Sequence, residues 1–288
     1  MTTSGERRPI VLGVDSLNIS PMVVDWAAAE ATRRNLPLRL VHAVLPEAYE
    51  LRGFDGGRFH EALRHSGETA LEKAMALVHE RHPAVETTSL LAEDNPAKVL
   101  CRESERAQLL VLGSRRMNRL EEWLSGYSVT VPVSAQAHCP VVVIRAPEHV
   151  TQQPPYVVVG VDGSRSAAAA VEFAADFATR RRAALRAVSV WQVPLIVPAE
   201  EHAVAEMIRE QLHQATAGLT DHDPDLDLTH EVLTGHPVEQ LAQASAHALA
   251  VVVGRRGRGG FTGMRLGPVP HGLLHHAHCP VITVPAHH

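Results

Sequence analysis

The sequence predicts an α/β protein with two tandem doubly wound domains, each a five-stranded parallel sheet covered by helices on both faces. Two observations support this prediction. Short apolar runs alternate with longer amphipathic segments, which is typical of buried parallel strands joined by helices. In addition, motifs of the first half of the chain recur in the same order in the second half. The 288 residues are enough for two hydrophobic cores of ordinary size.

The internal repeat indicates where the domains begin and end. Its clearest motif pairs are VLGVDS at 11–16 with VVGVDG at 158–163, LRLVHAV at 38–44 with LRAVSVW at 185–191, and AHCPVVV at 137–143 with AHCPVIT at 277–283. Ordered pairs of this kind indicate a duplicated domain rather than a short-period solenoid. We expect a first domain over residues 1–147 and a second over 155–288, with the proline-containing segment 146–155 as the linker.

Within each half, strands and helices are expected to alternate. Ser20 followed by Pro21 is an N-cap signal with proline at the first helical position, so a helix should run from there to Arg34. Asn95 before Pro96 gives the same signal for a later helix, after a long helical segment at about 58–81. The strands expected in the first half lie at 9–14, 38–44, 85–92, 109–112 and 140–144. The strands expected in the second half lie near 157–161, 185–190, 228–234, 249–253 and 281–284.

Composition excludes several classes of protein. A net charge of −5 gives no reason to expect a nucleic-acid partner, and no apolar run reaches the ~18 residues of a membrane span. The N-terminus lacks the apolar core of a signal peptide, so we expect a cytoplasmic protein. Cys101, Cys139 and Cys279 are far apart and form no CxxC pair, so they are interpreted as buried small residues rather than a disulfide or zinc site. His271 and His275 have metal-ligand spacing but no third ligand, so no metal site is predicted.

A glycine- and arginine-rich loop follows the apolar run 249–253 and precedes a segment compatible with a helix start. Gly254, Gly257 and Gly267 stand in the spacing G-x2-G-x9-G. Glycine lets backbone N–H groups approach a ligand closely, and the N-terminus of a helix favours negative charge. Together with the loop arginines, the strand, loop and helix start indicate a phosphate site.

This spacing resembles that of the ATP-binding members of the universal stress protein family, in which Ser or Thr follows the last glycine. The resemblance covers nearly the whole chain as two tandem copies. It implies the strand order 3-2-1-4-5 and bound ATP, with or without Mg²⁺. It also implies that the Asp after the first strand lies by the adenosine, and that a small apolar residue at the end of the second strand lines the adenine pocket. In relatives the fifth strand joins separate subunits, so we expect the two halves to form an intrachain pseudo-dimer through strands beginning at Pro140 and Pro280. A homodimer of whole chains stays open.

In the second half, the resemblance places the nucleotide at the carboxyl ends of three expected strands, in the glycine loop and at the helix start after that loop. They are Gly160, Asp162, Val190, Val253, Gly254, Gly257, Arg258, Gly267, Pro268 and Val269. This half departs from the family pattern because Pro268 stands where the hydroxyl is expected. Pro268 and Pro270 each remove a hydroxyl and a backbone donor, so phosphate binding should be weakened.

In the first half, the corresponding set is Gly13, Asp15, Val44, Leu112, Gly113, Arg116, Gly126, Ser128 and Val129, with Ala43 beside Val44. Here Arg116 replaces the second glycine, the loop is one residue longer before Ser128, and Glu121 and Glu122 place negative charge where a triphosphate would lie. We therefore expect the first-half site to be damaged and any nucleotide to bind mainly in the second half.

The leading hypothesis is a cytoplasmic tandem universal stress protein that binds adenine nucleotide in a stress-response or regulatory role. The sequence has no nucleophile elbow, no HEXXH motif and no paired carboxylates with an identifiable partner, so efficient catalysis is not expected, although slow ATP hydrolysis stays open. One alternative is a nucleotide-free regulatory scaffold with the same fold. Another is a related α/β enzyme, such as an adenylating ligase or an electron-transfer flavoprotein, but the SGGxDS and HIGH signatures of those ligases are absent.

Overall fold

The computed structural model describes residues 7–46, 56–114, 129–145, 149–192, 201–257 and 265–286. The chain divides into two compact units, Met1–Ile144 and Arg145–His288. No helix in the described ranges is long and apolar enough to cross a membrane. The sequence-based boundaries at 147 and 155 stay predictions.

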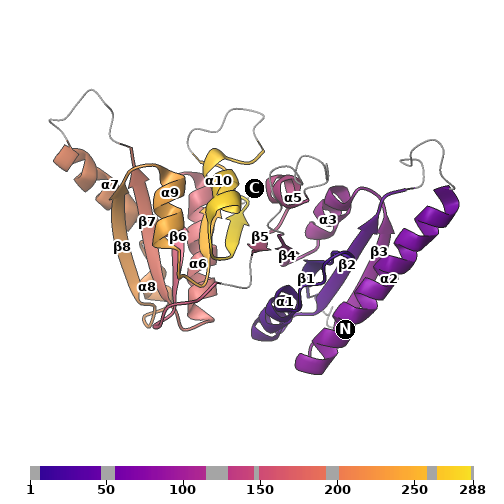
Figure 1. Cartoon of the computed structure of the whole chain (residues 1–288). Helices are drawn as coiled ribbons and strands as arrows, with labels where there is room; N and C mark the ends of the chain where they lie inside the picture. Colours follow the sequence, from indigo (N-terminus) through magenta and orange to yellow (C-terminus); the bar gives the residue numbers. More distant parts are fainter. Residues whose placement is uncertain are drawn as a thin grey trace, which may run out of the picture. The chain divides into compact units, whose positions relative to one another are not determined.

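The first unit is a parallel sheet with the strand order β3-β2-β1-β4-β5 (Figure 1). Its strands are β1 (Ile10–Gly13), β2 (Leu38–Val44), β3 (Thr87–Glu93), β4 (Leu109–Gly113) and β5 (Val141–Ile144). Its helices are α1 (Pro21–Arg34), α2 (Gly56–Arg81), α3 (Pro96–Ser104) and α5 (Thr130–Gln136). α1 and α2 cover one face of the sheet, and α3 and α5 cover the other. The predicted doubly wound fold and strand order are confirmed for this half.

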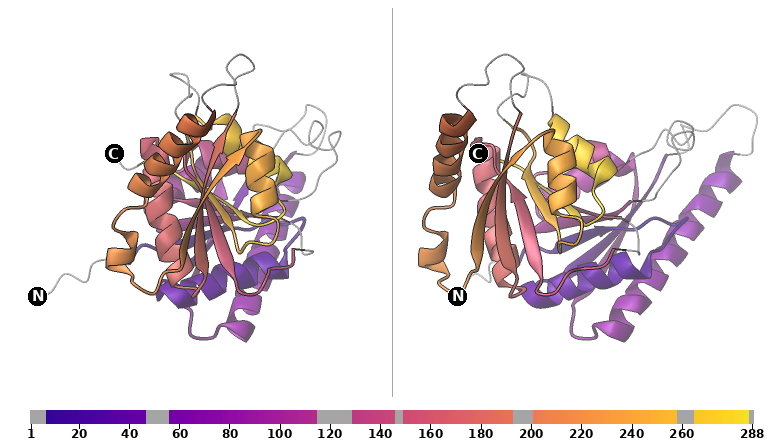
Figure 2. Two further views of the ribbon diagram at one scale, coloured as in Figure 1. Left: turned by 90° about the vertical axis from the view of Figure 1, so that its left-hand side faces the viewer. Right: turned by 60° about the vertical axis from the view of Figure 1, so that its left-hand side comes forward.

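The second unit repeats this arrangement with the order β10-β9-β6-β7-β8, again all parallel. Its strands are β6 (Tyr156–Gly160), β7 (Ala184–Trp191), β8 (Leu228–Thr234), β9 (Val251–Gly254) and β10 (Val281–Val284). Its helices are α6 (Arg165–Thr179), α7 (Glu201–Ala215), α8 (Leu219–His222), α9 (Pro237–Ala244) and α10 (Pro268–His276). In the left view of Figure 2, α6 and α7 lie on one side of the strands and α9 and α10 on the other.

The central strands are buried on both faces, as their unbroken apolar sequences require. Ile10, Val11 and Leu12 of β1 are buried, and so are Val251 and Val252 of β9. Because helices cover both faces of a parallel sheet, these strands have no polar side to alternate with. The core of each half is therefore formed by the same strands whose carboxyl ends can carry a site.

The helix starts follow the sequence signals with one difference. The Asn95 side chain accepts hydrogen bonds from the N–H groups of Ala97 and Lys98, which confirms the cap at the start of α3. α1 also begins where predicted, at Pro21 after Ser20, but the Ser20 side chain makes no capping hydrogen bond. Proline at the first helical position, with its φ already suited to a helix, sets this start without help from the serine.

Two of the three cysteines are buried, as expected. Cys139 is 5% exposed and Cys279 is fully buried, whereas Cys101 is intermediate. Burial disfavours the thiolate and raises the pKa of Cys139 to about 12 and that of Cys279 to about 11. The described residues contain no group of three or more His, Cys, Asp or Glu side chains that could hold a metal ion.

Candidate functional site

A cavity of about 260 Å³ opens at the carboxyl ends of β6 and β9 in the second half. β6 leads into α6 on one face of the sheet, while α10, which follows β9 in the chain, covers the other face. In open α/β sheets, ligands bind at such a switch point, where the connections diverge. The cavity is lined by Gly160, Val161, Asp162, Ser164, Ala167, Val188, Val190, Pro237, Leu241, Val253, Gly254, Arg256, Gly257, Gly267, Pro268, Val269 and Pro270.

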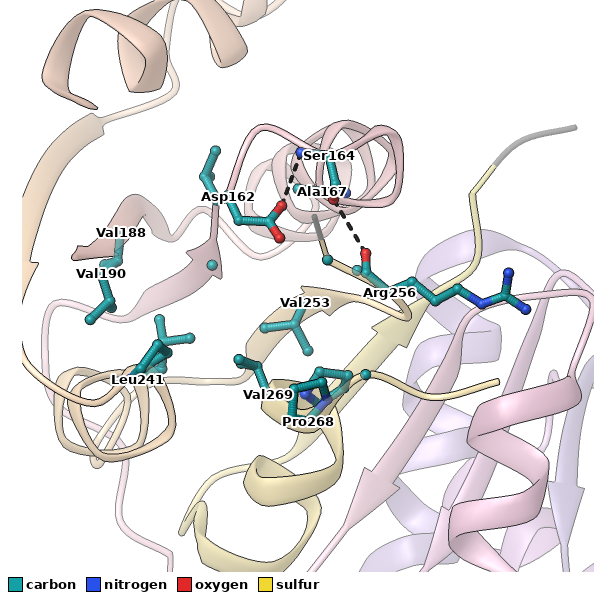
Figure 3. Close-up of a pocket in the computed structure, with 17 residues that line it drawn as sticks. Asp162, Ser164, Ala167, Val188, Val190, Leu241, Val253, Arg256, Pro268 and Val269 are labelled. Carbon is teal, nitrogen blue, oxygen red and sulfur yellow. Dashed lines mark hydrogen bonds between the residues drawn. The ribbon is translucent and has the colours of Figure 1, made fainter. Parts of the chain in front are cut away.

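One wall of the cavity is apolar and comes from three elements that are distant in sequence. Val188 and Val190 lie on β7, Leu241 on α9, and Val253 at the end of β9 (Figure 3). An apolar wall with few polar groups is typical of a site that takes a flat ring. The sequence pointed to Val190 and Val253 but gave no reason to select Leu241, which looks like an ordinary core residue of an amphipathic helix.

β7 extends beyond the end of β6, so Val190 has no β6 residue opposite it. β6 ends at Gly160 opposite Val188, and the next N–H, that of Val161, donates to the Val188 carbonyl at 2.8 Å. β7 continues to Trp191. Because backbone groups in a strand point to alternate sides residue by residue, the N–H and C=O of Val190 point the same way as those of Val188. They offer one donor and one acceptor beyond the end of β6.

One of the motif glycines is required by a close backbone contact, and a second lies against the end of an exposed side chain. A Cβ atom added to Gly254 would lie 2.6 Å from the carbonyl carbon of Ser166 in α6, so no other residue fits without moving the helix. A Cβ atom added to Gly257 would overlap the Asp162 carboxylate. Gly267 differs, because an added Cβ would make only ordinary contacts, the nearest at 3.5 Å from the Arg255 carbonyl oxygen.

Two serines fasten the glycine loop to the start of α6. The Ser164 hydroxyl accepts from the Ala167 N–H at 3.1 Å, which caps the helix, and donates to the Arg256 carbonyl at 3.2 Å. The Ser166 hydroxyl, which is buried, donates to the Val284 carbonyl at 3.2 Å and accepts from the Arg256 N–H at 3.4 Å. These bonds hold the loop over the cavity. The sequence signal was Ser164 soon after Asp162, an N-cap residue before an alanine-rich helix.

α10 begins with few backbone donors. Gly267 precedes it and donates its own N–H to the Arg255 carbonyl at 2.9 Å. Of the first three helical residues, Pro268 and Pro270 have no N–H, which leaves that of Val269. The fold tolerates both prolines because the first turn of a helix makes no internal bonds with these groups.

The described lining has few charged groups. They are Asp162 and Arg256, both exposed. Asp162 Oδ1 accepts from the Ser164 N–H at 3.0 Å, and its carboxylate lies beside Gly257. The Arg256 side chain extends away from the apolar wall (Figure 3).

Mg²⁺ in nucleotide sites is usually held by one or two carboxylates together with phosphate oxygens. Asp162 is the one carboxylate in the described lining, so it could contribute to magnesium binding only alongside phosphates.

The structure thus brings the predicted second-half residues around one cavity, with the exception of Arg258, which lies outside the described residues. The lining residues outside the predicted nucleotide-binding set come from the turn before α6 and its start, from β7 and α9, from the glycine loop and from the start of α10. They are Val161, Ser164, Ala167, Val188, Pro237, Leu241, Arg256 and Pro270. Local signals could have found part of this set: Ser164 as an N-cap residue, Arg256 as a loop arginine, and Pro237 as the repeat counterpart of Pro96.

In the first half, the described members of the predicted set lie at equivalent strand ends. Gly13 ends β1, Gly113 ends β4, and Asp15 accepts from the Leu17 N–H at 3.0 Å. Leu112 and Val44 are buried, and Val129 precedes α5. Arg116, Gly126 and Ser128 lie outside the described residues.

The register identifies the first-half counterpart of Val190. The Val14 N–H donates to the Val41 carbonyl at 2.8 Å, as Val161 does to Val188. Ala43 lies two residues beyond Val41 on β2. By the same alternation, its backbone groups point to the β1 side of β2, beyond the end of β1. Val44, which follows it, has its backbone groups on the opposite side.

Comparisons with known proteins agree with this architecture. The model of the universal stress protein family matches residues 6–145 and 156–285. Universal stress protein Rv2005c of Mycobacterium tuberculosis is 33% identical over 302 residues, a match that covers 98% of this chain and 99% of the relative. Universal stress protein Rv2623 of the same organism is 32% identical over 293 residues, with 98% of each chain covered.

A solved structure shows the same fold over nearly the full length. The crystal structure of a universal stress protein from Archaeoglobus fulgidus aligns with a TM-score of 0.73 at 17% identity and covers 96% of each chain. The family model matches both halves, and the relatives match almost from end to end. The chain therefore belongs to the universal stress protein family, with two family domains in tandem.

Proposed function

We propose that this protein binds an adenine nucleotide in the second-half cavity and acts as a regulatory binding protein without efficient catalysis. The proposal depends on one observation: the cavity combines an apolar wall with the backbone N–H and C=O of Val190, which lie beyond the end of β6. The motif by which the sequence resembles ATP-binding family members, Gly254, Gly257 and Gly267, lines the same cavity. The residues proposed for the base and those proposed for the phosphates thus line one cavity.

The Val190 backbone favours adenine over guanine. Adenine presents an amino donor next to a ring nitrogen acceptor, which complements a backbone C=O and N–H on one residue. Guanine presents a carbonyl oxygen in place of the amino group, so the same backbone groups would meet the opposite polarity. A buried polar pair of the wrong polarity costs binding free energy because both groups lose water without gaining a partner.

The described lining gives little means of catalysis. It contains no histidine, cysteine or lysine, and the Ser164 hydroxyl is already bonded to the Ala167 N–H and the Arg256 carbonyl. A hydroxyl nucleophile needs an adjacent base that accepts its proton. These features support binding, rather than rapid turnover, as the activity of the site.

Calorimetric titration of the full chain with adenosine triphosphate and guanosine triphosphate, each with Mg²⁺, tests the proposal. We expect binding of the adenine compound and at least about tenfold weaker binding of the guanine compound, the equivalent of one mispaired hydrogen bond. Mass spectrometry of protein purified without added nucleotide provides a second readout. A retained flavin, or equal affinity for the two bases, would contradict the proposal.

The alternative is a nucleotide-free scaffold, which the two prolines at the start of α10 favour. It predicts that no adenine compound binds to either half. In that case the tandem fold itself, with surfaces for a protein partner, would carry the regulatory role.

We also propose that the two halves pair through the edges of β5 and β10. Within the first half, β5 is the last strand of the sheet, and the carbonyls of Pro140 and Ile144 accept bonds from β4 and the residue after it. Backbone groups along a strand point to alternate sides, so the N–H of Val143 points away from β4. Val143→Pro removes that donor and should expand the chain in small-angle scattering, whereas Val143→Ala should not. Equal compactness of the two variants would argue against pairing.

A further inference from the structure

We infer that the amino-terminal edge of the first-half sheet is a docking site for an acidic segment of a partner protein. The site is a groove of about 1100 Å³ at the opposite end of the strands from Gly13 and Gly113. Its lining comes from the residues before β1, the starts of β2 and β3, and the end of α3 with the turn that follows. The groove lies within the first half, so it is independent of nucleotide binding in the second.

The groove gathers positive charge on a chain whose net charge is −5. Two of its arginines are explained by the fold itself. Arg39 Nε lies 2.8 Å from Glu103 Oε2, so these two charges neutralise each other. Arg102 lies in the last turn of α3, where a cation complements the helix dipole. The remaining arginines of the described lining are Arg7, Arg8 and Arg106.

The charges of Arg7, Arg8 and Arg106 are not neutralised by the described part of the chain. All three residues are exposed. Arg7 Nη1 donates to the Asn35 carbonyl at 3.2 Å, which orients the side chain but leaves its charge in place. Among the described residues, no carboxylate forms an ion pair with any of the three. Three such cations in one groove are a ready site for carboxylates from another molecule.

The repeat shows that the fold does not need these arginines. In the second half, Arg39 is matched by Arg186, which also pairs with a carboxylate, that of Glu231 at 2.6 Å. The positions of Arg7, Arg8, Arg102 and Arg106 hold, in that order, Pro154, Pro155, Gln243 and His247. The second half forms the same parallel sheet without them. Folding alone therefore does not account for the arginines of the groove.

The second half also shows that a chain segment fits against this edge of the fold. The Gln152 N–H donates to the His247 carbonyl at 3.0 Å, and His149 Nε2 lies 2.7 Å from the Ala248 carbonyl oxygen. The segment 149–152, which is neither helix nor strand, thus lies on the turn after α9. The turn after α3 is its counterpart in the groove. There the edge carries cationic side chains, which suit a segment that brings carboxylates.

The pattern of charge favours a protein segment over a phosphate polymer. Glu86 and Glu105 also line the groove. A nucleic acid or polyphosphate carries a charge on every unit and would place phosphates beside these carboxylates, and such like-charge contacts disfavour a partner. A peptide can place acids opposite Arg8 and Arg106 and a neutral residue opposite Glu86. Guanidinium groups also form paired hydrogen bonds with carboxylates.

Fluorescence anisotropy of a labelled peptide of alternating Glu and Gly, titrated with the full chain at about 50 mM salt, tests the inference. We expect a dissociation constant of about 100 μM or less, and binding at least about tenfold weaker for the matching peptide of Gln and Gly. Raising the salt to about 0.5 M should weaken the Glu peptide by a similar factor, because exposed charge pairs are screened.

The variant Arg8→Glu with Arg106→Glu should weaken the Glu peptide by at least about tenfold. Lys73→Glu with Arg81→Glu, on the exposed face of α2, is the matched control, since it changes the net charge equally outside the groove. It should bind the peptide as the unmodified chain does. Unaltered unfolding midpoints show that both variants are folded.

Several results would overturn the inference. They are failure of the Glu peptide to bind, or equal binding by the groove variant and the α2 variant. Inorganic polyphosphate that binds about tenfold more tightly per charge than the peptide would assign the groove to phosphate polymers instead. Peptide binding that tightens about tenfold when residues 2–5 are deleted would make the N-terminus of the chain itself the occupant.

Discussion

The two halves share a fold but differ in how closely one strand end packs against a helix. The strand ends are Gly254 of β9, beside α6, and Gly113 of β4, beside α1. In the second half, a Cβ atom on Gly254 would lie 2.6 Å from the Ser166 backbone. In the first half, a Cβ atom on Gly113 would meet nothing closer than the Val23 side chain at 3.3 Å. The same sequence signal, an apolar run ending in glycine, therefore marks a clash with backbone in one half and a milder close contact with a side chain in the other.

The connection after the first strand explains part of this difference. α6 begins at Arg165, soon after Asp162, and Ser164 bonds both the helix and the glycine loop. α1 begins at Pro21 after a longer connection from Asp15, and Ser20 makes no side-chain capping bond. In the second half, the short connection between β6 and α6 therefore lets one serine hold both the helix start and the glycine loop, and the longer connection before α1 has no such described bond from Ser20.

The largest expected effect is on binding. Gly257→Arg copies the first-half residue Arg116 into the second half, and even the added Cβ atom would overlap the Asp162 carboxylate. We expect adenine nucleotide affinity to fall by about 100-fold or more, because the arginine side chain would occupy space beside the loop backbone that the ligand needs; this fall corresponds to about 3 kcal/mol. Asp15→Ala in the first half is the control, and calorimetry should show no change. Binding that survives Gly257→Arg but is lost in Asp15→Ala would move the site to the first half.

Stability should show the next largest contrast. Gly254→Ala forces the Ser166 backbone to move and should lower the unfolding free energy by about 1–3 kcal/mol. Gly113→Ala meets a side chain that can shift by a few tenths of an ångström, so its cost should be about 0.5 kcal/mol or less. Urea unfolding of both variants measures the difference. Equal costs would mean that the two glycines are packed alike.

The two caps provide a finer comparison. Ser164→Ala should cost about 1 kcal/mol because it removes the acceptor for the Ala167 N–H, whereas Ser20→Ala should cost only a few tenths. Ser164→Asp keeps a cap acceptor but cannot donate to the Arg256 carbonyl, so it should restore stability and still weaken nucleotide binding. If Ser164→Asp binds normally, the serine acts on the helix alone.

The smallest expected effect depends on pH. The His230 ring lies 4.0 Å from that of His213, and its Nε2 lies 2.7 Å from the Thr216 hydroxyl, whereas the equivalent first-half residue is Ser89. Partial burial and the neighbouring His213 lower the pKa of His230 below 6.5. His230 therefore binds a proton more readily in the unfolded chain than in the folded one, so the free energy of unfolding falls as the pH drops below about 6.5. His230→Gln should flatten this decline in unfolding experiments between pH 7.5 and 5.5. An equally steep decline in the variant would exclude His230 as its source.

Much of the fold could be predicted because its signals are local. Unbroken apolar runs gave the strands, Asn95-Pro96 gave the start of α3, and the repeat gave the equivalence of the two sheets. The strand limits differed by a few residues, as at β3, where the Val85 N–H bonds the His82 carbonyl in a turn and the strand begins at Thr87. Strand ends depend on such turn bonds, which the apolar pattern does not encode.

The site was harder to predict, since its wall is assembled across the sheet. Leu241 and Ala167 have the sequence character of helix core residues, and nothing local shows that they reach the cavity. The double role of Ser166 depends on Val284 and Arg256, which are far away in sequence. Gly267 belongs to the motif but has room for a side-chain carbon, so packing within the protein does not by itself require a glycine there.

The burial of Cys139 and Cys279 at the same place in each repeat has a practical consequence. With pKa values of about 12 and 11, neither thiol is nucleophilic while its half is folded, but each regains ordinary reactivity once that half opens. A brief pulse of a thiol-alkylating reagent, followed by peptide mapping, would therefore record the opening of each half separately within one chain. The duplicated molecule carries a chemical reporter for each of its domains without any label being introduced.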